Sequence, residues 1–154
     1  MSTPVKGLKD IHAKLSNERK IGGVIETQFI RLRSGEEYKN AVITNVDVMG
    51  SSFYSLSFVN DEGQHMIVNV AEIGMISVPV HKKIVECQNQ TYKQIKIEEK
   101  LTYLKRLYEV NEGSTNPLFV EEAKMVIQDI GIENVKPVLD VSFLSKPQKL
   151  YSIA

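Results

Sequence analysis

The sequence has no tryptophan, a single cysteine and no apolar run near the ~20 residues that a membrane-spanning helix needs. One cysteine, Cys87, cannot form an intramolecular disulfide. The N-terminus also lacks the basic and then apolar pattern of a secretory signal. We therefore expect a reducing, cytoplasmic compartment and no association with a membrane.

Neither sign of charge is in excess. Nineteen Lys and Arg residues balance nineteen Asp and Glu residues, so the formal net charge is zero. The chain as a whole is therefore not attracted to phosphate backbones, and any contact with nucleic acid must be local. With 42% hydrophobic and 25% charged residues, the 154-residue chain has the composition of a folded globular protein.

Signatures of catalysis and of metal or phosphate binding are also missing. The histidines are scattered and have no serine or cysteine nearby in a nucleophile context: His12, His65 and His81. His65 lies near Asp61 and Glu62, but charged residues are common at a hairpin turn for solubility alone. Cys87 lacks an activating partner and is expected to be a small buried hydrophobe. We predict a protein that is not an enzyme and has no cofactor.

An amphipathic helix is predicted near the N-terminus, between Ser2 and Lys20. Leu8, Ile11 and Leu15 recur at spacings of three and four residues, which places them on one helix face. Lysines occupy much of the remaining surface: Lys6, Lys9 and Lys14. Such a basic face either contacts phosphates or is simply solvated, and the second role is the commoner one.

From Gly23 to Pro79 the hydrophobic period changes to two. Phe29, Arg31 and Arg33 alternate with apolar residues, and a polar turn at residues 34–37 follows. Further on, Tyr54, Leu56 and Phe58 alternate with serines. Short strands joined by tight turns tend to close into barrels. We therefore predict that residues 1–79 form a helix and a small, strongly bent antiparallel β-barrel.

The remainder, residues 80–154, is predicted to be a mainly α-helical extension or domain, which makes the fold class α+β. The start of a helix is indicated by Asn116-Pro117 and its end by Gly131. Residues 91–97 fit either a strand or a helix, and the sequence leaves that choice open. Residues 132–154 include a short apolar stretch, 138–141, which suggests a strand or a docked extension.

The order of these features resembles the Sm and Hfq family of small barrels over residues 5–79. In that family a helix precedes a motif that reads roughly Leu-x-Asn-Gly-x-x-(Tyr or apolar)-x-Gly, followed by an apolar strand that ends in Asp. Ser34-Gly35 matches the turn and Tyr38 the apolar position, while Asn40 stands where Gly is usual. Asp47 falls one residue late for the strand end. Residues 66–73 lie where the second motif is expected.

The resemblance implies a ring of six or seven subunits, joined edge to edge by strands, that binds single-stranded RNA at an inner rim. In the bacterial branch an aromatic residue and a Lys-His pair hold the bases. This chain has Met49 and Asn69-Val70 at those places. We therefore expect weak binding through cations rather than through base pockets. The expected contacts are polar or basic residues of the helix and of the first strands: Lys6, Lys9, Lys14, Arg31, Arg33, Lys39 and Asn40.

Two other functions stay open at this point. A protein-interaction or assembly module fits the balanced charge equally well, and so does a pocket between subunits for a small anionic, nucleotide-like ligand. That pocket would use Arg31, Arg33 or Arg106. In each case we expect the chain to associate with itself, because a small bent sheet leaves edges to be paired. Asp47 is predicted to be structural, accepting hydrogen bonds from backbone amides in the turn near Gly50.

Overall fold

The computed structural model describes residues 2–112 and 116–142 and shows two compact units, Met1–Ile95 and Lys96–Ala154. Helices and antiparallel sheets together confirm the predicted α+β class. The division falls later than the expected boundary after residue 79. The reason is that β9 (Val80–Lys82) pairs within the sheet of the first unit, and η2 (Ile84–Glu86) follows it there.

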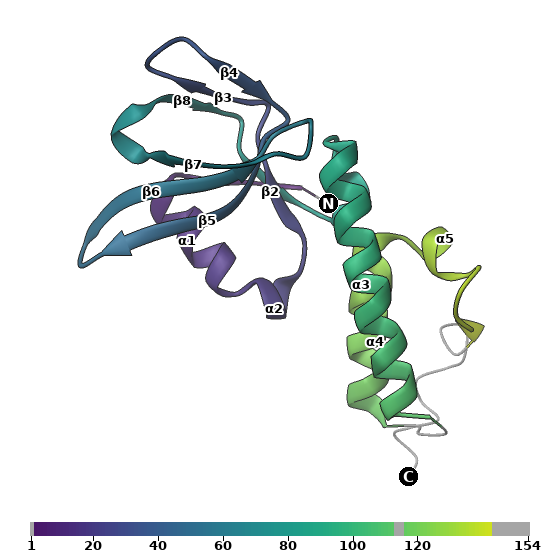
Figure 1. Ribbon diagram of the computed structural model, residues 1–154. Helices are drawn as coiled ribbons and strands as arrows, with labels where there is room; N and C mark the ends of the chain where they lie inside the picture. Colours follow the sequence, from purple (N-terminus) through teal and green to yellow (C-terminus); the bar gives the residue numbers. More distant parts are fainter. Residues whose placement is uncertain (1, 113–115, 143–154) are drawn as a thin grey trace. The chain divides into compact units, whose positions relative to one another are not determined.

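The predicted N-terminal helix is shorter than expected. A two-residue strand, β1 (Thr3–Pro4), precedes α1 (Leu8–Ser16), and a separate turn of helix, α2 (Glu18–Ile21), follows. The expected apolar face is present, since Ile11 is buried and its neighbours Leu8 and Leu15 pack against the same core. Figure 1 shows α1 beside β5, which it contacts.

The strands of the first unit form two antiparallel sheets. The six-stranded sheet has the order β1-β9-β2-β5-β6-β7, and the three-stranded sheet has the order β4-β3-β8. A single 3-10 turn, η1, separates β7 from β8. The remaining bounds are β2 (Val24–Glu26), β3 (Phe29–Leu32), β4 (Glu37–Lys39), β5 (Val42–Met49), β6 (Ser52–Val59), β7 (His65–Asn69), η1 (Val70–Glu72) and β8 (Ile73–Ser77).

The two sheets are joined by strands that bend from one into the other. Only two residues separate β2 from β3, β4 from β5, and β8 from β9, and backbone hydrogen bonds bridge these gaps. Thr27 N donates to Ala41 O at 2.9 Å, and Gln28 N donates to Ser77 O at 2.8 Å. Strands that change sheet at a bend make the corners of orthogonally packed sheets. The three pairs therefore act as three long, sharply bent strands.

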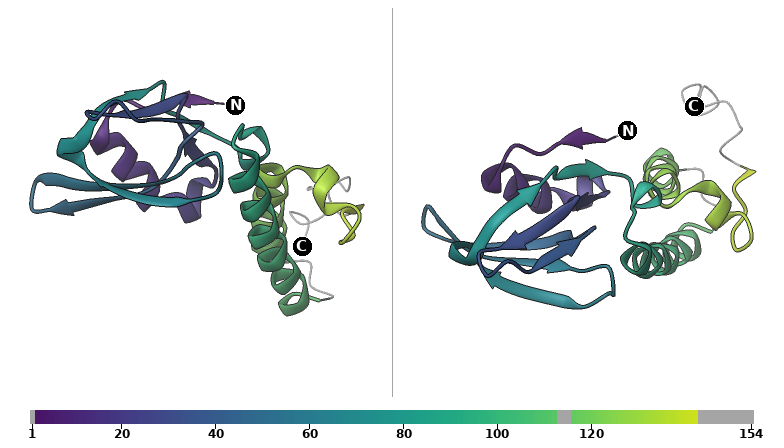
Figure 2. Two further views of the ribbon diagram at one scale, coloured as in Figure 1. Left: turned by 45° about the horizontal axis from the view of Figure 1, so that its top comes forward. Right: turned by 90° about the horizontal axis from the view of Figure 1, so that it is seen from above.

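The expectation of a closed barrel is not met. The six-stranded sheet ends at β1 and β7 and the three-stranded sheet ends at β4 and β8, and β7 does not pair with β8. The inside of the bend is nevertheless a true core, in which Ile30, Ile43, Leu56 and Phe58 are at most 1% exposed. Figure 2 shows the β5–β6 hairpin projecting beyond the rest of this unit.

The second unit is helical. Residues 91–97 prove to be helix, because α3 runs over Gln90–Val110; α4 (Pro117–Ile130) and α5 (Ile132–Val135) follow. The predicted start of α4 is confirmed, since the Asn116 side chain accepts from Leu118 N at 2.9 Å. Tyr108 packs edge-on against Phe119. Residues 138–141 form no strand, and residues 143–154 of the expected extension lie outside the described part of the chain.

In the part of the chain that the structure describes, the helices are too short or too polar to cross a lipid bilayer.

Candidate functional site

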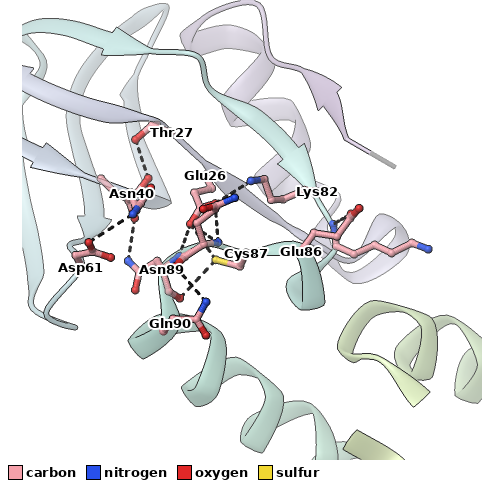
Figure 3. Close-up of polar contacts among 12 residues, drawn as sticks. Glu26, Thr27, Asn40, Asp61, Lys82, Glu86, Cys87, Asn89 and Gln90 are labelled. Carbon is pink, nitrogen blue, oxygen red and sulfur yellow. Dashed lines mark hydrogen bonds and ion pairs between the residues drawn. The ribbon is translucent and has the colours of Figure 1, made fainter. Parts of the chain in front are cut away.

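A buried carboxylate organises the densest polar cluster of the first unit. Glu26 ends β2 and is 2% exposed. Its carboxylate accepts from Lys82 Nζ at 2.8 Å, from Gln88 N at 2.9 Å and from Asn89 N at 2.7 Å. Figure 3 shows Glu26 between Lys82 on one side and Cys87 with Asn89 on the other. A buried charge is tolerated when it is paired and hydrogen-bonded in this way.

Asn89 extends this cluster to the β6–β7 turn and to helix α3. The residue is fully buried, and its amide nitrogen donates to Asn40 O and to Asn60 O, both at 2.9 Å. Its side-chain oxygen accepts from Tyr92 N at 3.0 Å, which caps the first turn of α3. Thr91 adds a bond to Asp61 O at 3.1 Å. The start of α3 is thereby fixed to the sheet by side-chain bonds.

Cys87 belongs to the same cluster and is 2% exposed. Its thiol donates to Glu26 Oε2 at 3.2 Å. Burial, and then the adjacent Glu26 charge, raises the pKa of Cys87 to about 12. The thiol is therefore protonated near neutral pH and is a poor nucleophile. The structure bears out the sequence-based view of Cys87 as a buried residue without an activating partner.

The outer side of this cluster opens into a cavity of about 340 Å³. Its lining combines Lys82 with the amide side chains of Gln28, Asn40 and Gln88. In the described part of the chain, two residues other than glycine have a positive φ: Asn40 at 51° and Val78 at 45°. Both line this cavity, and both lie at strand bends. The cavity was not predicted from the sequence, and Asn40 alone among its lining residues was an expected binding residue.

Among the predicted RNA-binding residues, Arg31 and Lys39 lie on one sheet face. The register pairs Arg31 with Glu37 and Phe29 with Lys39, so these four side chains share the face opposite the buried Ile30. Arg31 forms an ion pair with Glu37 at 2.8 Å and also stacks over the Phe29 ring at 4.8 Å from its centre. The charge of Arg31 is thus partly neutralised.

The other predicted cations lie elsewhere. Arg33 falls in the turn after β3 rather than on the strand face, because β3 ends at Leu32. Lys6 and Lys9 are exposed, whereas Lys14 pairs with Asp10 at 3.4 Å. Among the described residues, no hydrogen bond or ion pair joins the helix lysines to the strand cations. Asn40 lies at the bend between β4 and β5, where it lines the cavity.

The role predicted for Asp47 differs from what the structure shows. Asp47 lies within β5, directly opposite Ser55 on β6, and not in the turn. Its carboxylate accepts from Ser55 Oγ at 2.8 Å and from Asn45 Nδ2 at 3.2 Å. Strand β5 continues past Asp47 to Met49, so the turn at residues 50–51 begins three residues beyond Asp47. Asp47 therefore stabilises a cross-strand pair instead of capping the turn amides.

The remaining polar candidates do not converge. His65 is exposed at the start of β7, and Asp61 and Glu62 lie exposed in the turn before it. Over residues 2–112 and 116–142, no group of three His, Cys, Asp or Glu residues is arranged to hold a metal ion. Arg106 is exposed on α3 within the second unit.

The sequence signals for Glu26 and Lys82 were too weak to reveal them as partners. Glu26 lies 56 residues from Lys82 and 63 from Asn89, so no local spacing joins them. Asn89 alone carried a usable signal, since Asn is a favoured cap in front of a helix. That signal was missed because residues 91–97 fit a strand equally well.

Comparisons of the chain with known protein-family models, with curated proteins and with solved structures found no match.

Proposed function

We propose that the protein is a non-enzymatic, Sm-like binding module that assembles with itself and binds single-stranded RNA weakly through cations. The observation that carries this proposal is that two of the terminal strands, β7 and β8, each leave one edge open. Within the described residues, β7 pairs only with β6, and β8 pairs only with β3. An open edge offers unpaired backbone groups to another strand.

These two edges lack the usual protection against pairing. Neither β7 nor β8 contains a lysine, an acidic residue or a proline. Ile67 on β7 is 65% exposed and Met75 on β8 is 47% exposed. Beside β8 lies an apolar groove of about 420 Å³ lined by Leu8, Ile73 and Met75, among others. Pairing β7 of one copy with β8 of the next is a head-to-tail contact, which closes into a ring when the rotation between copies permits.

The conformation of Asn40 supports the Sm-like assignment. The family pattern has Gly at this position, and here Asn40 adopts a φ of 51°. Glycine reaches this region without strain, and Asn is the residue that most often replaces it there. The bend that a glycine would permit is therefore retained. The order of a short helix followed by short bent strands is also what the resemblance implies.

Binding of RNA is supported by the face that carries Arg31, Lys39 and Phe29. Cations beside a half-buried aromatic ring are the components of sites that bind single strands, because cations neutralise phosphates and rings stack on bases. The Arg31 and Glu37 ion pair lowers the charge of this face, which fits weak binding. A reducing cytoplasm is part of the proposal, and the free, buried Cys87 fits it.

Two measurements test the proposal. Light scattering should give a mass several times the 17.4 kDa of one chain. Titration with a single-stranded oligonucleotide should show affinity that falls steeply with salt, with a slope of about −0.7 for each phosphate contact. Arg31→Glu should weaken this binding, whereas Lys105→Glu, at an exposed position on α3, is the matched control. A mass of one chain refutes assembly, and no binding even at ~50 mM salt refutes the RNA function.

A second candidate function is a protein-interaction module. In the second unit, Val110 at the end of α3 is 83% exposed and Leu118 at the start of α4 is 73% exposed. Val110 and Leu118 lie at successive helix ends, and exposed apolar surface can mark a site for a partner protein. The test is a binding assay with a partner protein. If Leu118→Lys abolishes that binding while the mass and the RNA affinity of the variant stay unchanged, this function is favoured.

A further inference from the structure

We propose that the cavity at the strand bends of the first unit binds a nucleobase. This site is formed within one subunit, and it lies apart from the rim positions of Met49 and Asn69. The proposal needs neither the ring nor the cationic face. The ligand chemistry is a neutral, planar heterocycle, supplied either by a free nucleoside or by one base of a single strand.

The first argument is the charge of the lining. Glu26 and Lys82 are the charged residues among those that line the cavity, and their ion pair at 2.8 Å leaves no net charge. A phosphate or other strong anion gains little from a lining whose one ammonium is already paired. A neutral ligand with its own hydrogen-bonding groups suits this environment better.

The second argument is the supply of amide groups. Gln28 uses its side-chain oxygen to accept from Ser77 Oγ at 2.9 Å, which leaves its amide nitrogen as a donor. The Gln88 side chain has no hydrogen bond within the described residues, although its backbone N–H donates to Glu26. Asn40 donates to Asp61 at 3.4 Å and keeps its side-chain oxygen as an acceptor. Side-chain amides that offer donors and acceptors together are the groups that pair with base edges.

The third argument is backbone strain at the cavity. Val78 is β-branched, has a φ of 45° and is 62% exposed, so burial in the core does not explain its apolar side chain. A glycine would allow the same bend without strain. Strain that the core does not need is typical of positions that hold a ligand. Val78 and Val80 line the cavity and provide apolar contact for the face of a ring.

The size of the cavity limits the ligand. About 340 Å³ lies at the lower end of the range of ~300–1,000 Å³ for small-molecule sites. One heterocycle with part of its sugar fits such a volume. A pocket of this kind should bind a nucleoside with a Kd of ~0.1–1 mM.

The test is a titration of the full-length, ¹⁵N-labelled chain with adenosine and, separately, with uridine. We expect saturable shifts of the Gln28, Asn40 and Gln88 amide signals with at least one nucleoside. Gln88→Ala and Gln28→Ala should each weaken binding about 5–10-fold, the effect of one lost hydrogen bond. Gln128→Ala, which removes an exposed amide from α4, is the matched control and should leave the Kd unchanged.

A parallel titration with oligoadenylate and oligouridylate distinguishes the two ligand sources. Shifts at the cavity with nucleosides support a site for a free base. Shifts there with the oligonucleotide alone, lost in Gln88→Ala, support a site for a base within a strand. The proposal is overturned if neither ligand shifts these signals at ~10 mM nucleoside, or if Gln88→Ala and Gln128→Ala bind alike. An oligonucleotide that binds through Arg31 without affecting the cavity overturns this inference and leaves the proposed RNA function intact.

Discussion

At the scale of single residues, the buried Glu26 carboxylate binds several segments of the chain to one another. Its bonds to Lys82, Gln88 and Asn89 hold β2, β9 and the segment before α3 in one arrangement. On folding, protein donors replace the water molecules that bind the carboxylate in the unfolded chain. This replacement matters because an unpaired buried charge destabilises a protein far more than a buried ion pair stabilises it. The rigid wall that results is also one side of the cavity.

Replacing Glu26 by Ala should therefore lower the free energy of unfolding by about 3–5 kcal/mol, since the half-buried Lys82 ammonium and the backbone amides of Gln88 and Asn89 lose their acceptor. Glu37→Ala is the control, because it removes an ion pair that is also 2.8 Å long but exposed to solvent. That change should cost about 0–1 kcal/mol. Urea midpoints of both variants measure the difference. Equal losses would show that the Glu26 cluster contributes no more than a surface ion pair.

The thiol of Cys87 makes stability depend on pH in the alkaline range. Its pKa is raised from an ordinary 9.0 to about 12 in the folded chain, chiefly by burial. The unfolded chain therefore loses this proton first as the pH rises. The stabilising contribution is fully present below about pH 9 and is lost progressively as the pH approaches 12.

Cys87→Ala removes this titration, so the stability of the variant should fall less steeply from about pH 8 to about pH 10.5 than that of the natural chain. Urea midpoints of both proteins across that interval provide the measurement. The difference between the two slopes is the informative quantity, because Tyr108, whose pKa is also raised to about 12, titrates in both proteins. Parallel slopes would mean that the Cys87 thiol ionises in the folded state as it does in the unfolded chain.

At the scale of elements, the strand bends decide the fold. Two-residue breaks turn three long strands from one sheet into the other, and Asn40 and Val78 adopt left-handed conformations at two of them. A left-handed conformation costs a residue with a Cβ roughly 1–2 kcal/mol. Burial of apolar residues offsets this cost, because each bend places apolar residues of the same strand on the inner faces of both sheets.

Val78→Gly should raise the free energy of unfolding by about 0.5–1 kcal/mol, because the relief of strain exceeds the added backbone freedom of glycine. Val80→Gly, two residues on and within β9, is the matched control. It should lower stability, since a strand glycine loses packing and gains freedom in the unfolded state. Thermal unfolding of the pair gives the comparison. Destabilisation by both changes would indicate that Val78 is held by packing and is not strained.

Local pattern predicted the elements better than their arrangement. The buried positions of Leu56 and Phe58 and the Asn116 cap were readable because neighbours in sequence determine them, whereas Tyr54, which the same alternation grouped with them, is 49% exposed. The bend at Thr27-Gln28 has neither Gly nor Pro, so no turn signal marked it. The Glu26 cluster depends on pairs more than fifty residues apart, and the cavity depends on all three bends together. The role of Asp47 was misassigned because its partner, Ser55, is set by the pairing of β5 with β6 and not by the nearby turn.

At the scale of the whole molecule, each copy presents one β7 edge and one β8 edge, and these are different surfaces. A contact between them is heterologous, so every copy in a closed ring uses both edges. A two-fold dimer, in contrast, would use the same edge twice. The two arrangements predict different outcomes when one edge at a time is blocked.

A charge on an edge strand discourages pairing, so Ile67→Lys should block β7 and Met75→Lys should block β8. Each variant alone should have the mass of one chain. Mixed in equal amounts, they should form a complex of twice 17.4 kDa, because each supplies the intact edge that the other lacks. Tyr54→Lys on β6, 49% exposed and away from both free edges, should leave the natural assembly unchanged. Light scattering of the mixture decides the matter: two variants that stay as single chains when mixed would rule out head-to-tail pairing of β7 with β8.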